Sequence, residues 1–304
     1  MTAAEHSAFL LQIVKYVNVA SLTILVTDYF QTLELEIELI WSAKWGLVKI
    51  LFLFARYSTF FDVPLVLYYS LARRPSNQKC LVIYSIASWS TCFGIEVSEV
   101  ILIVRTYALS GNSRNILIYL LTQFVVISTA VIVVLVIFLR SLRYGSPPLP
   151  TVMGCYPTEG SKILFADFVL LMLNETTIMI LTLWIGVKRY RHSRNPLIVT
   201  LYRDGIFYFI YLFLISAANI VVLVVGPPEL IDLVDTFQRV MHSILSTRIL
   251  LHVRNTNRDR EVASISNLRF GSRPDRRKWY QSNTFATDQS TVVPPTTEEN
   301  IELE

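Results

Sequence analysis

Long runs of apolar residues, separated by short polar segments, make up most of residues 1–254. Seven of these runs are roughly 20 to 27 residues long, the length at which an α-helix crosses the hydrocarbon core of a bilayer. They cover residues 12–33, 47–71, 81–107, 115–139, 163–187, 205–226 and 230–253. The pattern predicts an all-α fold: a polytopic membrane protein in which residues 1–254 form a bundle of seven transmembrane helices.

The polar segments between and after these runs differ in composition. Residues 141–162 are rich in Pro, Gly and Ser, which is typical of an ordered loop or a lid. Residues 33–41 (LELEIELIW) alternate with period two, but so short a segment between two spans predicts an interfacial turn with its glutamates in water. Residues 255–304 are polar, basic at first and acidic at the end, so we expect a disordered cytoplasmic tail.

The composition agrees with a membrane protein, because 53% of the residues are hydrophobic and only 16% are charged. Soluble domains average about 45–50% and about 25%. The net charge is only +4, and the basic residues gather in the connections and the tail. This favours the lipid bilayer, and not nucleic acid, as a partner. Lys and Arg are more frequent on the side of residues 188–195 and the tail, which places the N-terminus outside and the tail in the cytoplasm, as in a plasma-membrane protein.

Two of the three cysteines fall on the same side of the predicted bundle. With the N-terminus outside, Cys80 lies at the outer end of the third span and Cys155 lies in the outer connection 141–162. Both would face an oxidising compartment, where a disulfide between them would tie this connection over the bundle. The alternative is that both are incidental small residues. Cys92, inside the third span, is expected to serve packing.

A group of charged residues lies within the spans, nearer their cytoplasmic ends. An isolated charge at this depth costs about 2.5–3.5 kcal/mol or more, so such residues need partners. Glu96 and Glu99 share one helix face, at about the depth of Arg56. We therefore predict an inner charge network in which Arg56 meets Glu96 or Glu99, with Asp28 and Arg248 nearby. It is either a structural clamp between the second and third spans or a switch.

A second polar layer lies nearer the outside, beneath the Pro-rich connection. Its members are Asp62, Glu175, Asn219, Asp235, Arg239 and His242. Polar residues grouped between helices are typical of a ligand pocket, which we expect here. The alternative is structural pairing, with Asp62 bound to Arg239.

The motif Arg105-Thr106-Tyr107 ends the third span. Together with seven spans, an external N-terminus and the two outer cysteines, it resembles the plan of G-protein-coupled receptors, whose rhodopsin-like class carries Arg-x-Tyr at this point. The match is partial. Val104, not an acid, precedes Arg105; residues 230–253 lack NPxxY; and residues 205–226 contain no proline.

A second resemblance covers the N-terminal quarter and two later stretches, RTYALSGNSRNILI and HSILSTRILLHVR. These segments resemble a large membrane-protein family of mushroom-forming (basidiomycete) fungi that is known as a domain of unknown function. The resemblance implies a membrane protein and no particular activity. The positions that carry it in the N-terminal quarter are Asp28-Tyr29, Glu36, Ile40-Trp41, Lys49 and Arg56-Tyr57.

Motifs of known chemistry are absent from the sequence, which has no HExxH, no GxSxG and no P-loop. Residues 230–253 contain no lysine for the retinal Schiff base that an opsin needs. Of four histidines, only His242 lies well inside a span. We therefore expect no enzyme, no bound metal and no cofactor.

The sequence favours a seven-helix receptor or sensor that binds a small extracellular ligand and reports to a cytoplasmic signalling protein. One alternative is a proton- or ion-coupled transporter, because acids within a membrane often mark ion pathways. Another is a membrane scaffold whose tail binds partners. Substitution of the intramembrane acids separates the first two, and deletion of the tail separates the third.

Overall fold

The computed structural model describes residues 3–73, 75–145, 153–190 and 196–271. Contacts divide the chain into two units, Met1–Thr256 and Asn257–Glu304, and the arrangement described below concerns the first. The long helices of the described residues are α1 Ala3–Glu36, α2 Leu47–Leu71, α3 Asn77–Leu109, α4 Arg114–Ser141, α5 Phe165–Tyr190, α6 Pro196–Val225 and α7 Asp235–Gly271.

Shorter elements fill some of the connections. A π-helix, η1 (Ile37–Trp41), continues α1 without a break, and two 3-10 turns are η2 (Lys162–Leu164) and η3 (Pro228–Leu230). Strands β1 (Arg143–Gly145) and β2 (Tyr156–Glu159) pair antiparallel. The connection that we expected to be a loop therefore contains a small β-hairpin, while residues 146–152 lie outside the described part.

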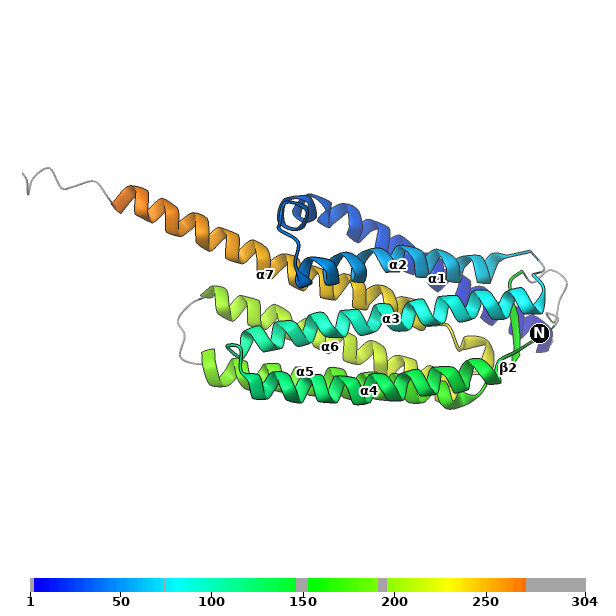
Figure 1. The fold of residues 1–304 in the computed structure, drawn as a ribbon. Coiled ribbons are helices and arrows are strands. Elements are labelled where there is room, and N and C mark those ends of the chain that lie inside the picture. The colour runs from blue at the N-terminus through cyan, green and yellow to red at the C-terminus, as the bar shows by residue number, and fades with distance from the viewer. Residues whose placement is uncertain (1–2, 74, 146–152, 191–195, 272–304) are drawn as a thin grey trace, which may run out of the picture. The chain divides into compact units, whose positions relative to one another are not determined.

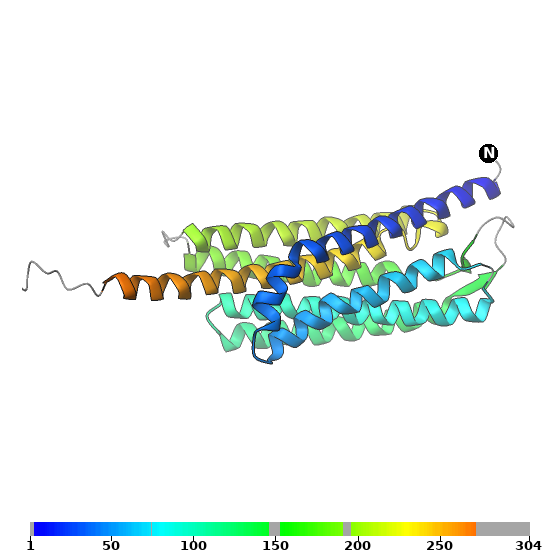
Figure 2. The same ribbon diagram turned by 90° about the horizontal axis from the view of Figure 1, so that it is seen from above.

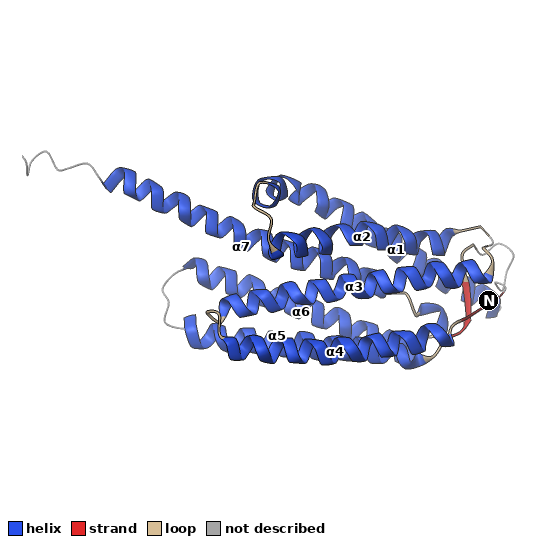
Figure 3. Cartoon of the chain, in the orientation of Figure 1, coloured by secondary structure: helices blue, strands red, loops and turns tan. Residues whose placement is uncertain are grey.

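Within the first unit, the helices run side by side along one direction (Figure 1). The N-terminus and the β-hairpin lie at the same end of this unit, which we call the hairpin end (Figures 1 and 2). Figure 3 shows how small the hairpin is beside the helices. α1 crosses over α7 (Figure 2), and the crossing is tied by contact of Asp28 with Arg248.

Polar and apolar side chains are placed in this unit as a lipid solvent requires. Large apolar side chains such as Ile118, Val125 and Val133 are exposed on α4, whereas Arg239 and Asp62 are almost completely buried. Six helices are long and apolar enough to cross a membrane, by length and composition over the described residues: Glu5–Trp41, Leu47–Leu71, Asn77–Leu109, Arg114–Ser141, Lys162–Lys188 and Tyr208–Val225. The chain is therefore a helical, multi-pass integral membrane protein whose environment is the lipid bilayer.

The expected seventh span, 230–253, is not among these six helices. The corresponding part of α7 carries many buried polar side chains, among them Gln238, Arg239 and His242. These side chains contact α2, α3, α5 and α6. Because this helix touches protein rather than solvent over much of its surface, its composition need not be apolar.

α7 also continues beyond Arg254, where we expected the ordered part of the chain to end. It remains helical to Gly271, whereas we expected a disordered tail from residue 255. The sequence explains this, since the stretch contains no glycine or proline before Gly271 and Pro274. The rest of the expected tail, 272–304, lies outside the described residues.

Candidate functional site

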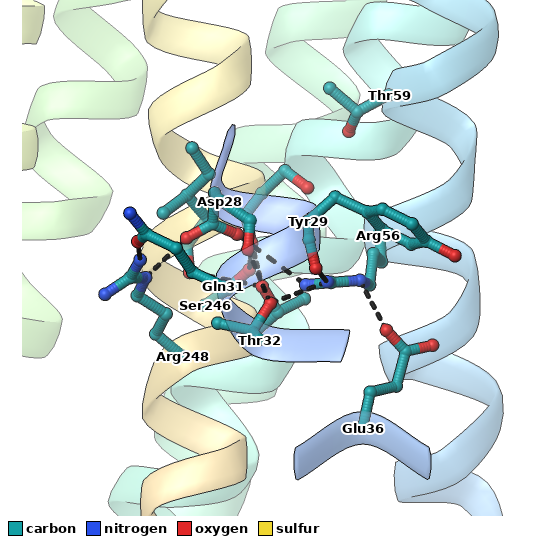
Figure 4. A network of polar contacts seen from close by, with 12 residues as sticks. Asp28, Tyr29, Gln31, Thr32, Glu36, Arg56, Thr59, Ser246 and Arg248 are labelled. Atoms are coloured by element: carbon teal, nitrogen blue, oxygen red, sulfur yellow. Dashed lines mark hydrogen bonds and ion pairs between the residues drawn. The ribbon is translucent and has the colours of Figure 1, made fainter. Parts of the chain in front are cut away.

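Arg56 of α2 is bound by a network of groups from α1 (Figure 4). Its Nε lies 2.6 Å from Glu36 Oε2, and its Nη1 lies 3.7 Å from Asp28 Oδ2. Its Nη2 donates to Thr32 Oγ1 at 2.6 Å and to the Tyr29 carbonyl at 3.3 Å. The Tyr29 ring also faces the guanidinium, 5.1 Å from its centroid. One arginine thus fastens α2 to several successive turns of α1.

Two further contacts extend this Arg56 network. Glu36 is 0% exposed, and its Oε1 accepts hydrogen bonds from Tyr57 (2.8 Å) and Trp41 (3.2 Å). Asp28 also pairs with Arg248 of α7 through Oδ1. The network therefore joins α1, α2 and α7, with each buried carboxylate paired to an arginine and hydrogen-bonded.

The predicted contact of Arg56 with Glu96 or Glu99 is not the one found. Among the described residues, the carboxylate of Glu96 accepts from Ser128 of α4, and that of Glu99 accepts from Asn174 of α5. The depths of these residues along the membrane were estimated from the sequence, but depth leaves the rotation of each helix about its axis undetermined. Arg56 lies on the face of α2 that meets α1, so Asp28 and Arg248 share its network while the two α3 glutamates do not.

Glu36 was missed because residues 33–41 were expected to form a turn with glutamates in water. In the structure the helix continues through Glu36 into η1, and this side chain is buried. A signal for it exists in the sequence. Asp28, Thr32 and Glu36 are spaced four residues apart, which places all three on one face of an unbroken helix.

Arg239 of α7 forms a second buried contact, with α2 and α3. Its Nε lies 2.8 Å from Asp62 Oδ2, and its Nη2 donates to Ser58 Oγ at 2.7 Å. Ser90 of α3 donates to the other oxygen of Asp62. Gly94 of α3 faces the guanidinium directly, because a Cβ at this position would lie 2.7 Å from Nε and closer still to the other guanidinium atoms. The structure thus contains the Asp62–Arg239 pairing that the sequence offered as the alternative to a pocket.

A third group joins α3, α5 and α7 and is called the Glu99–Glu175–His242 cluster below. His242 Nε2 lies 3.0 Å from Glu175 Oε1, and His242 Nδ1 lies 3.7 Å from Glu99 Oε1. The second oxygen of each glutamate is held from outside the cluster. Asn174 donates to Glu99 Oε2, and Ser216 of α6 donates to Glu175 Oε2, each at 2.9 Å.

Further hydrogen bonds connect this cluster to α6. Gln238 of α7 donates to Ser216 Oγ at 2.9 Å and accepts from the amide of Asn219. Glu175, Asn219 and His242, expected to line a pocket, are thus tied to one another through these bonds. Gln238 and Ser216 were not anticipated, because neutral polar residues within an apolar run carry no signal of the partner they face.

A cavity of about 90 Å³ lies between α3, α4, α5 and the start of α7. Of the six residues expected to form the ligand pocket, Asp235 lines it. The described lining residues include the rings of Tyr84, Phe138 and Phe168 and four acids, and no Lys, Arg or His is among them. The acids are Glu96, Asp167, Asp232 and Asp235.

Asp232 lies in the turn before α7, outside the spanning helices. Burial raises the pKa of its carboxyl to about 6, although the hydrogen bond that Tyr84 donates to it, 2.9 Å long, lowers the pKa. Tyr84 and Asp232 also line a second cavity, of about 220 Å³, which is bounded by Pro157 and Thr158 of β2. This residue pair therefore stands between the hairpin and the acid-lined cavity.

A disulfide joins Cys80 at the start of α3 to Cys155 just before β2. The backbone beside it is also fixed, since Cys155 N–H donates to the Tyr69 carbonyl (3.2 Å) and Gly154 N–H to the Ala72 carbonyl (2.9 Å). Gly154 has φ +98°, a conformation that glycine adopts readily. The β-hairpin is thus fastened to the ends of α2 and α3.

Residues 16–61 match the family described as Family of unknown function (DUF6533). This stretch contains the α1 and α2 members of the Arg56 network, Asp28, Tyr29, Thr32, Glu36 and Arg56. No curated protein matches the chain. The chain is therefore similar, over its N-terminal region, to a family whose function is unknown.

Proposed function

We propose that this protein is a seven-helix receptor or sensor that binds a small cationic ligand at the hairpin end. The observation that carries the proposal is the acid-lined cavity. Four carboxylic acids and three aromatic rings converge there without a basic side chain among the lining residues. Carboxylates and ring faces both attract an ammonium group, and the apolar remainder of the lining suits a short hydrocarbon portion.

The surroundings of the cavity support an approach from the hairpin end. The second cavity, beneath β2, shares Tyr84 and Asp232 with the acid-lined one. A disulfide is stable in an oxidising compartment, so we place the hairpin and the N-terminus outside the cell. The protein is then a plasma-membrane protein with the plan of a G-protein-coupled receptor, and α7 is its seventh span.

Signalling would follow from differential binding between two arrangements of the helices. α3, α5 and α7 contribute acids to the cavity, and the same helices carry the buried contacts beneath it. A ligand that draws these acids together would change the positions of the three helices relative to one another. The change would extend to their cytoplasmic ends, where a signalling protein would bind the altered surface. The protein performs no chemical conversion in this proposal.

The test begins with the purified protein in detergent. Small primary and quaternary ammonium compounds are screened by thermal unfolding beside neutral compounds of the same shape. We expect selected ammonium compounds to raise the unfolding temperature and their neutral counterparts to leave it unchanged. Asp167→Asn and Asp235→Asn should each raise the compound concentration needed for the same stabilisation about tenfold. Glu34→Gln, which changes an exposed acid on α1, should leave that concentration unchanged.

The proposal fails if neutral compounds stabilise equally, or if the two Asn variants respond as the parent does. A ligand found in this way then separates receptor from transporter. Recruitment of labelled G-protein subunits by the ligand supports the receptor. Accumulation of the ligand inside proteoliposomes, with no recruitment, supports the transporter.

A further inference from the structure

The Glu99–Glu175–His242 cluster places two buried carboxyl groups against one imidazole. All three side chains are at most 2% exposed. In the described part of the chain, neither glutamate pairs with a lysine or an arginine. Arg239 lies one turn before His242 on α7, but it is bound to Asp62. With both carboxylates ionised, as metal binding requires, the cluster has a net negative charge whether the ring is neutral or protonated.

The atoms at the centre of the cluster face one another and no group outside it. Glu99 Oε1, Glu175 Oε1 and both ring nitrogens of His242 make no hydrogen bond of good geometry to any group outside the cluster; they face one another, with His242 Nε2 3.0 Å from Glu175 Oε1. The outward oxygens, by contrast, are held by Asn174 and Ser216. One oxygen fixed by an amide or hydroxyl and the other free toward a common centre is the arrangement of carboxylates that bind a metal ion.

The spacing and the atom types fit one class of ion. One ligand atom from each of the three residues lies within 4.8 Å of the other two. Zn²⁺ holds imidazole nitrogen and carboxylate oxygen at about 2.0–2.2 Å, so a small closure of the cluster would surround it. Ca²⁺ and Mg²⁺ favour all-oxygen sites, whereas an imidazole with carboxylates suits zinc and related ions. We infer that Glu99, Glu175 and His242 bind a divalent transition-metal ion of the Zn²⁺ or Mn²⁺ class.

Such an ion balances the charge and joins three helices at one point. Two positive charges neutralise the two carboxylates, and one ring nitrogen gains a partner. Glu99, Glu175 and His242 each follow an acid of the cavity by one to about two helical turns on the same helix. The ion therefore fixes the spacing of α3, α5 and α7 next to the cavity. This inference does not depend on the proposed ligand, and it revises the expectation from sequence that no metal is bound.

The test uses the full-length protein without a polyhistidine tag, purified in detergent and stripped with a chelator. The protein is equilibrated with Zn²⁺ or with Mn²⁺ and separated by gel filtration, and its metal content is measured by mass spectrometry. We expect about one ion per chain for at least one of the two metals. Glu99→Gln, Glu175→Gln and His242→Gln should each reduce this content at least tenfold.

Two matched controls show whether the loss is specific. Glu34→Gln removes an exposed acid on α1, and His252→Gln removes an exposed histidine further along α7. Both variants should bind the metal as the parent does. A metal content that falls with His252→Gln instead would assign the ion to the surface and overturn the inference.

A measurement on the wild-type protein tests the metal site without relying on variants, which can fail to fold. Co²⁺ bound by nitrogen and oxygen ligands absorbs visible light, so the stripped protein should gain such bands with Co²⁺ and lose them when Zn²⁺ is added. The rival arrangement is an imidazolium held between two carboxylates. It predicts no bound Co²⁺, Zn²⁺ or Mn²⁺ and an unfolding temperature indifferent to chelator, and that result would exclude the metal site.

Discussion

Arg239 is only 1% exposed and is enclosed by α2 and α3, with Asp62 and Ser58 accepting its hydrogen bonds. A buried ion pair of this kind is costly to break, because removing one partner leaves the other charge without compensation, at about 3–5 kcal/mol. Gly94 matters for the same reason, since its missing side chain makes the space in which the guanidinium lies. The close packing of α7 against α3 therefore depends on the absence of a side chain at Gly94.

Gly94→Ala should destabilise the protein through Arg239. The added methyl group would overlap the guanidinium, which must move away from Asp62 or push α3 outward. We expect a loss of about 1–3 kcal/mol, the usual cost of overpacking a core. Thermal unfolding in detergent measures it, and Gly46→Ala, where nothing lies within 4 Å of the added atom, is the control. Equal losses in the two variants would mean that Gly94 makes no special contribution.

Asp232→Asn should make the protein more stable at neutral pH. Because burial raises the pKa of this carboxyl from 3.8 to about 6, the contribution of Asp232 to stability is greatest below pH 3.8 and falls as the pH rises to about 6. Asparagine removes this penalty and still accepts the Tyr84 hydrogen bond. We expect a gain of about 3 kcal/mol at pH 7.5 that disappears near pH 4, measured by thermal unfolding across this range. A gain that is the same at both pH values would contradict the assignment to ionisation.

At the scale of the elements, the length of an apolar run is a reliable measure of a spanning helix, and the first six predicted runs correspond to helices that can cross a membrane. The partners inside the bundle were harder to predict. Asp28, Thr32 and Glu36 form one stripe only if α1 continues through residues 33–41, where the alternating pattern suggested a turn. Arg56 and Glu99 have similar depths but lie on faces that do not meet, because rotation about the helix axis is set by packing with neighbours.

An exchange of charges distinguishes the two pairings of Arg56. Arg56→Glu alone should destabilise the protein by about 3–5 kcal/mol, since it places a third carboxylate beside Asp28 and Glu36. Combining it with Glu36→Arg restores an opposite pair between α1 and α2 and should recover part of the loss. Combining it with Glu99→Arg should recover nothing, because Glu99 belongs to the cluster with His242. Thermal unfolding of the three variants gives the answer, and recovery by Glu99→Arg instead of Glu36→Arg would favour the pairing inferred from depth.

At the scale of the whole molecule, the first unit has polar contacts inside and apolar side chains outside, and α7 takes part in most of the interior contacts. The Arg56 network, the Asp62–Arg239 pair and the Glu99–Glu175–His242 cluster all include residues of α7 or contact it. A helix that contacts mainly other helices, and not lipid, can carry many polar side chains, so its mean hydropathy is low. Composition therefore identifies six helices that can cross the membrane, and our proposal that α7 crosses with them rests on the burial of its polar side chains.

The number of crossings decides on which sides of the membrane the two chain ends lie. If α7 crosses, the chain has seven spans, so an epitope tag before residue 1 and one after residue 304 should lie on opposite sides. In intact cells, antibody should reach the N-terminal tag only, and both tags after permeabilisation, because the basic connections favour a cytoplasmic tail. A chain cut after Gly226 retains six spans, so its C-terminal tag should move to the outside. If both tags of the full-length chain instead lie on one side, α7 does not cross. The buried polar contacts of α7 would then have to form outside a membrane-spanning bundle.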